Sequence, residues 1–149
     1  MCQKKHHRGS FGENYCFGLE QLPAKGDTLF ITGGEKDVLS LAAHGFHAIC
    51  FNSETVTIPP TLVYRLTFRF KHIVLLFDMD KTGRESSRKQ EKLLEEFGVK
   101  RLLLPLPGTK EEKDISDYFK AGNTAFRLCS QDMRQYRMFQ CSQSFCKTY

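Results

Sequence analysis

The 149-residue sequence lacks several features that would assign it to a specialised class. No apolar run approaches the roughly 18 residues that a membrane-spanning helix needs, and the first residues are polar and basic rather than an apolar secretion signal. The six cysteines include no Cys-x-x-Cys pair, and His6 and His7 have no matching ligand cluster, so no zinc site is expected. We therefore expect a cytoplasmic protein without membrane contact, in which Cys50 is a buried free thiol.

The charge is only mildly unbalanced. A net charge of +5, from 22 Lys+Arg and 17 Asp+Glu, permits nucleic-acid binding but does not argue for it alone. Hydrophobic residues make up 40% of the chain, enough for one sizeable core. We predict an N-terminal arm over residues 1–26, one domain over residues 27–122 and a C-terminal tail over residues 123–149.

Apolar segments alternate with turn residues through the predicted domain. Strands are predicted at Thr28–Thr32, His47–Phe51, His72–Asp78 and Lys100–Leu104. Helices are predicted at Glu35–His44, Glu85–Phe97 and Asp114–Lys120, and a short helix or an extended piece at Thr61–Arg69. Short links between alternating strands and helices indicate parallel strands joined by crossovers. The predicted fold class is α/β, with a mainly parallel sheet of about four strands flanked by helices.

Asp78 and Asp80 directly follow a nearly all-apolar strand. Alternate residues of a strand share a face, so the two carboxylates are predicted to converge as the strand ends. Such a pair suits Mg²⁺, which prefers oxygen ligands and needs few from the protein. Aspartates are also common in turns and at helix starts, but two of them beside a buried strand favour a functional site, because burying unpaired charge is costly.

Two further polar segments follow predicted strand ends. The turn Gly33–Asp37 is neither a Walker loop nor GxGxxG, and alone its Glu35 and Asp37 would be ordinary first-turn residues. Asp114 or Ser116 alone would be the cap of the last helix. In parallel α/β sheets, however, function gathers at the carboxyl ends of the strands. Acidic residues from three loops on one edge repel each other unless a cation neutralises them.

Three segments together resemble the TOPRIM domain, the metal-dependent module of bacterial and phage-type DNA primases, type IA and II topoisomerases and some nucleases. They are VLSLAAHGFHAICFNSET (residues 38–55), IVLLFDMDKTGRES (residues 73–86) and LPLPGTKEEKDISDYF (residues 104–119). The primase branch is the most similar, and the resemblance covers about residues 27–122. It implies a single Rossmann-like TOPRIM domain.

The resemblance also implies roles for individual residues. Ligands for Mg²⁺ or Mn²⁺ would be Asp37, Asp78, Asp80 and Asp114. Contacts to phosphates or nucleic acid would come from Lys36, Arg84 and Lys113. The family's first motif normally reads Glu-Gly-x-x-Asp, with the glutamate as the proposed general acid–base group, but here Gly33 stands in its place. The catalytic set carried over is therefore Glu35, two residues away, with Asp78 and Asp80.

The implied function is Mg²⁺-dependent nucleotidyl transfer or nucleic-acid processing in DNA replication, by a primase fragment or a stand-alone relative. The implied partners are DNA or RNA, nucleoside triphosphates, and a replicative helicase or the remainder of a larger primase. Alternatives are a catalytically impaired nucleic-acid- or partner-binding module, which Gly33 encourages, and a metal-dependent nuclease. The stretch LLFDMDKTG also resembles the opening of haloacid-dehalogenase-type phosphatases, although there it usually lies on the first strand.

Overall fold

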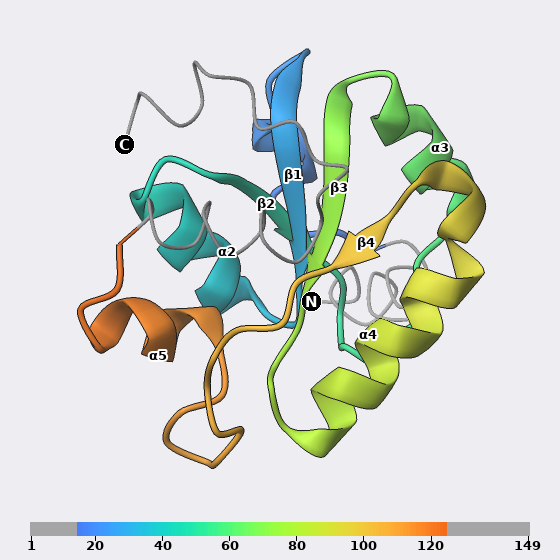
Figure 1. Cartoon of the computed structure of the whole chain (residues 1–149). Coiled ribbons are helices and arrows are strands. Elements are labelled where there is room, and N and C mark those ends of the chain that lie inside the picture. Colours follow the sequence, from blue (N-terminus) through green and yellow to red (C-terminus); the bar gives the residue numbers. More distant parts are fainter. Residues whose placement is uncertain (1–14, 125–149) are drawn as a thin grey trace, which may run out of the picture.

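A central parallel sheet organises the chain, for which a computed structural model describes residues 15–124 (Figure 1). The strand order is β2-β1-β3-β4, and every pairing is parallel. The strands are β1 (Gly26–Thr32), β2 (His47–Cys50), β3 (Phe70–Leu76) and β4 (Lys100–Arg101). The predicted α/β class with a four-stranded parallel sheet is confirmed.

Helices cover both faces of the sheet (Figure 1). They are α2 (Glu35–Ala43), α3 (Pro60–Thr67), α4 (Lys81–Leu93) and α5 (Ile115–Lys120), with short 3₁₀ turns η1 (Leu19–Gln21) and η2 (Glu95–Phe97). Side chains alternate along β1, so Phe30 packs in one buried cluster, with α2 and α5, while Leu29 and Ile31 pack in the other, with α3. The central strands are therefore apolar on both faces, as a covered parallel sheet requires.

The strand before the two aspartates begins and ends two residues earlier than predicted. It ends at Leu76, so Asp78 and Asp80 lie in the turn after β3 rather than on it. Helix α4 begins at Lys81 instead of Glu85, because the Asp80 side chain accepts a hydrogen bond from the Gly83 N–H at 2.9 Å and caps the helix. Asp80 therefore belongs both to the turn after β3 and to the N-cap of α4.

Other boundaries differ in smaller ways. Strand β4 covers Lys100–Arg101 instead of Lys100–Leu104, although the Leu102 N–H still donates to the Leu75 carbonyl at 2.8 Å. The ambiguous segment Thr61–Arg69 is mainly helical, as α3, with a proline in its first turn, where the fixed φ of proline suits a helix.

The predicted arm and the predicted tail lie partly outside the described residues. Phe17, within the predicted arm, forms an antiparallel bridge with Cys50, which is buried and free as predicted. The predicted tail lies almost wholly in residues 125–149, outside the described part, so the domain boundaries stay predictions. Within residues 15–124, no helix combines the length and the apolar character needed to cross a bilayer.

Candidate metal centre

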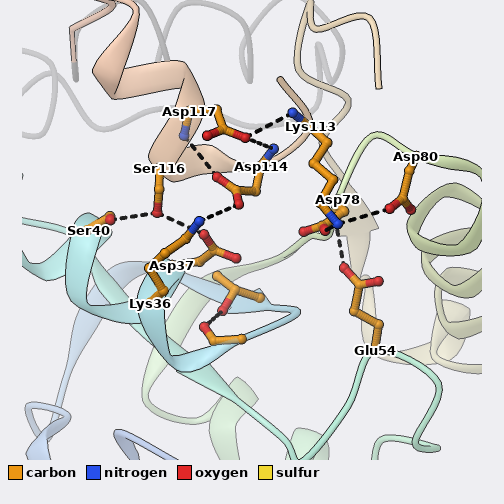
Figure 2. Close-up of polar contacts among 12 residues, drawn as sticks. Lys36, Asp37, Ser40, Glu54, Asp78, Asp80, Lys113, Asp114, Ser116 and Asp117 are labelled. Carbon is orange, nitrogen blue, oxygen red and sulfur yellow. Dashed lines mark hydrogen bonds and ion pairs between the residues drawn. The ribbon is translucent and has the colours of Figure 1, made fainter. Parts of the chain in front are cut away.

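Acidic side chains from four segments face one another beyond the carboxyl ends of the strands (Figure 2). Asp37 lies in the first turn of α2, after β1, and Glu54 lies in the loop after β2. Asp78 follows β3, and Asp114 immediately precedes α5. Because parallel strands end at the same edge of a sheet, residues far apart in the sequence meet there.

The carboxylates form two groups that share Asp78. The Asp37 group consists of Asp37, Asp78 and Asp114, and the Glu54 group consists of Glu54, Asp78 and Asp80. Within each group, one oxygen from every residue lies within 4.8 Å of the others. The four aspartates predicted as metal ligands are thus divided between the groups: Asp37 and Asp114 lie in one, Asp80 lies in the other, and Asp78 lies in both.

Met79 anchors the turn that carries Asp78 and Asp80. Its side chain is buried, its N–H donates to the Lys113 carbonyl at 2.6 Å, and its sulfur accepts the Leu104 N–H at 3.1 Å. Because Met79 is held in the core, its neighbours Asp78 and Asp80 are fixed at the edge of the sheet.

Helix α4 approaches this turn so closely that only glycine fits at position 83. A Cβ on Gly83 would lie 2.8 Å from the Asp78 carbonyl carbon and 2.9 Å from the Asp78 nitrogen. The two aspartates are therefore held by the core on one side and by the helix start on the other.

Lys113 joins the two aspartates of the turn. Its Nζ lies 2.8 Å from Asp78 Oδ2 and 3.2 Å from Asp80 Oδ2. The Gly83 N–H and Lys113 together lower the pKa of Asp80, and the hydrogen bonds to both carboxylates raise the pKa of Lys113. The space between these carboxylates therefore stabilises positive charge.

Asp37 is the most enclosed of the carboxylates. It is 5% exposed, and its Oδ1 accepts a hydrogen bond from the Ser116 hydroxyl at 3.0 Å. The Ser116 hydroxyl also lies 2.7 Å from the Ser40 hydroxyl. Burial, and after it the nearby charge of Asp114, raise the pKa of Asp37 to about 7. A cation beside Asp37 would offset both effects.

Asp114 has a structural role as well as a place in the Asp37 group. Its Oδ1 accepts the Asp117 N–H at 2.8 Å, and Asp117 Oδ2 accepts the Asp114 N–H at 3.3 Å, which completes a capping box. Its other oxygen, Oδ2, lies 2.7 Å from Lys36 Nζ, and this hydrogen bond raises the pKa of Lys36. The capping interpretation and the acidic-group interpretation therefore apply to the same residue.

Two predicted site residues point elsewhere. Glu35 is exposed, accepts a hydrogen bond from the Tyr15 hydroxyl, and belongs to neither acidic group. The Arg84 Nε donates to the Met79 carbonyl at 2.7 Å, so this side chain braces the Asp78–Asp80 turn. Their catalytic and phosphate-binding roles stay predictions.

Glu54 was missed by the sequence reasoning. Its Oε1 accepts the Asp78 N–H at 2.9 Å, and burial raises its pKa to about 7. The available signal was its position just past the carboxyl end of β2, where the rule for parallel sheets expects functional residues.

Residues 30–119 match the family model described as Toprim-like, so the chain belongs to that family and the predicted resemblance is confirmed. A comparison with curated proteins found no match.

Solved primase structures share the fold. The primase fragment of the bacteriophage T7 primase-helicase protein is 23% identical, with a TM-score of 0.60, over 83% of this chain and 48% of that one. The DnaG catalytic core is 17% identical, with a TM-score of 0.64, over 83% of this chain and 40% of that one. This chain thus spans less than half of either structure, and at these identities the likeness shows the fold alone.

Proposed function

We propose that this domain performs primase-type nucleotidyl transfer, dependent on Mg²⁺ or Mn²⁺, in DNA replication. The observation that carries the proposal is the convergence of carboxylates from four segments into two groups that share Asp78. Membership of the Toprim-like family and a fold shared with primases support it.

The donor set fits a hard divalent cation. Each group offers only carboxylate oxygens, which Mg²⁺ and Mn²⁺ prefer, and each already attracts a lysine ammonium. The proposed ligands are Asp37, Asp78, Asp80 and Asp114. A bound ion would offset the charge of a nucleoside triphosphate and of the leaving pyrophosphate.

Basic side chains surround the same carboxylates. Lys113 lies within ion-pair distance of Asp78 and Asp80, and Lys36 lies within ion-pair distance of Asp114. Both ammonium groups are therefore placed where they could contact a phosphate bound at this edge. Arg84 braces the turn through one nitrogen, and its guanidinium carries further donors. We propose that all three contact phosphates of the triphosphate or of nucleic acid.

The proposed partners follow from this chemistry and from the resemblance to primases. They are DNA or RNA, nucleoside triphosphates, and a replicative helicase or the remainder of a larger primase, in the cytoplasm. One T7 structure, with a TM-score of 0.55 at 21% identity, contains primase domains bound to an RNA/DNA hybrid and dTTP; the match covers 80% of this chain and 58% of that one.

The second candidate is a catalytically impaired module that binds nucleic acid or a protein partner. It is favoured by Gly33 at the position of the family's glutamate and by the absence of Glu35 from both acidic groups. Two observations disfavour the phosphatase alternative: the chain belongs to the Toprim-like family, and Asp78 follows β3, which two other strands precede in the chain.

Calorimetric titration with Mn²⁺ and Mg²⁺ tests the metal centre. Asp78→Asn removes the carboxylate that both groups share, so we expect the affinity to fall by at least about 10-fold. Asp27→Asn is the matched control, because Asp27 lies near the start of β1 and pairs with Lys71 at 2.9 Å. Identical isotherms for wild type and Asp78→Asn would refute the metal centre.

Primer synthesis separates the two candidates. Wild type that extends primers on single-stranded DNA with nucleoside triphosphates and Mn²⁺ supports nucleotidyl transfer. Metal and DNA binding without synthesis supports the impaired module. Single-strand nicking under the same conditions would favour the metal-dependent nuclease, which would use the same acidic groups.

A further inference from the structure

Gly33 and Glu54 compete for the same space. A Cβ built on Gly33 would lie 2.5 Å from Glu54 Cγ and 2.7 Å from Glu54 Cδ, and it would also overlap Glu54 Oε1. Real Cβ atoms are not found that close to other atoms, so any side chain at position 33 would displace Glu54. Gly33 is therefore required for Glu54 to lie where it does.

Strand register explains why these two positions meet. Strands β1 and β2 pair in parallel, with Thr32 opposite Cys50, so the residues that follow both strands leave the sheet side by side. Gly33 is the first residue after β1, and Glu54 lies in the loop after β2. A carboxylate can thus be delivered to one place either from position 33 or from position 54.

Glu54 is fixed at the acidic site rather than free in solvent. Its Oε1 accepts the Asp78 N–H at 2.9 Å, and it groups with Asp78 and Asp80 (Figure 2). Lysine or arginine ion pairs reach Asp78, Asp80 and Asp114, but among residues 15–124 none reaches Glu54. A half-buried carboxylate in this position adds negative charge that a bound cation would offset.

We propose that Glu54 supplies the metal-site carboxylate that position 33 lacks, and that Gly33 is glycine to admit it. The proposal rests on the metal-dependent function proposed above. The glutamate that the family resemblance places after the first strand is delivered here from the end of the neighbouring strand. The acidic set is then complete, with its members rearranged among the loops.

An exchange of the two residues tests this proposal directly. Mn²⁺ titration by calorimetry would compare wild type, Glu54→Gln, Gly33→Glu and the double variant Gly33→Glu/Glu54→Gly. We expect Glu54→Gln, which lacks the carboxylate, to lose at least about 10-fold in affinity. Gly33→Glu should lose less, because it displaces only the flexible side chain of Glu54 and brings a carboxylate to the same place. The double variant should recover to within about threefold of wild type, because its two changes compensate.

Control measurements distinguish a specific effect of Glu54 from a folding defect. Glu96→Gln, on the exposed turn η2, should bind like wild type. Thermal melting in EDTA identifies any variant that fails to fold, and Glu54→Gln, which preserves size, carries the test if Gly33→Glu does not fold.

Each outcome has one interpretation. Wild type that binds no Mn²⁺ overturns the proposed function itself. Wild type and Glu54→Gln binding equally overturns only the role of Glu54. A folded double variant that binds as weakly as Glu54→Gln overturns the exchange.

Discussion

The two acidic groups share Asp78 but differ in how the fold holds their other members. In the Asp37 group, Asp37 and Asp114 are 5% and 6% exposed and belong to the starts of α2 and α5. In the Glu54 group, Glu54 and Asp80 are only partly buried and lie in the loop after β2 and the turn after β3. Changes in the Asp37 group should therefore alter stability as much as binding.

The lysines differ in the same way. Lys36 is largely exposed and contacts Asp114, a carboxylate that already accepts a helix N–H. Lys113 is more enclosed and contacts two carboxylates of the turn at once. Exposed ion pairs contribute little to stability, so the larger electrostatic effect of a lysine belongs to the Glu54 group.

The largest expected effect concerns the pH dependence of stability. Burial raises the pKa of Asp37 from 3.8 to about 7, so the folded state binds a proton that the unfolded state loses between these values. This contribution to stability is complete below about pH 4 and is lost as the pH rises through 7. Each unit of raised pKa corresponds to roughly 1.4 kcal/mol. The free energy of unfolding of Asp37→Asn, relative to that of wild type, should therefore be higher at pH 8 than at pH 4 by on the order of 3 kcal/mol.

Urea unfolding in EDTA at a series of pH values would measure this difference. Asp80→Asn is the opposing control, because the pKa of Asp80 is lowered and its stabilising contribution is present above its unfolded pKa. Parallel stability curves for wild type and Asp37→Asn would show that Asp37 is not protonated by burial.

A smaller effect separates the two roles of Asp114. Asp114→Ala removes the N-cap of α5 and should cost about 1–2 kcal/mol, whereas Asp114→Asn keeps a good cap and should cost less than half of that. Both variants lose the carboxylate charge, so we expect similar losses of metal affinity. Denaturant unfolding combined with calorimetry would measure both quantities, and equal destabilisation by the two variants would rule out a capping contribution.

The smallest effect is expected at Glu35. Its side chain is exposed, contacts Tyr15 and lies in neither acidic group, so Glu35→Gln should change Mn²⁺ affinity by less than about twofold, or about 0.4 kcal/mol. Calorimetry beside Glu54→Gln gives the comparison. A tenfold loss of Mn²⁺ affinity in Glu35→Gln would indicate that Glu35 has the role of the glutamate in the family's first motif.

Much of this arrangement was predictable from sequence, because parallel strands bring residues that follow them to one edge. Asp37 and Asp78 come shortly after apolar strands, and Asp114 lies in the loop after the fourth strand, so the three could be grouped on that rule. The predicted end of the strand before Asp78 came two residues too late, because apolar residues continue beyond the last paired residue and only the Gly83 hydrogen bond marks the helix start.

Glu54 shows the limit of such reasoning. It is a single carboxylate in a polar loop, and its partner Asp78 lies 24 positions away. Its importance depends on the register of β1 against β2 and on the missing side chain of Gly33. Neither a motif spacing nor the periodicity of a helix or strand predicts a placement that depends on Gly33, Glu54 and Asp78 together.

The anchoring of Met79 bears on which ion the site would accept. Its N–H binds the Lys113 carbonyl, next to Asp114, and its sulfur accepts the Leu104 N–H, so the acidic turn and the loop before α5 are joined through the core. Mg²⁺ needs oxygens at about 2.1 Å, whereas Ca²⁺ needs more of them at about 2.3–2.6 Å. Loops joined in this way have little freedom to separate around a larger ion. We therefore expect Met79, although it is uncharged and would not contact the ion, to help the site distinguish Mg²⁺ from larger ions.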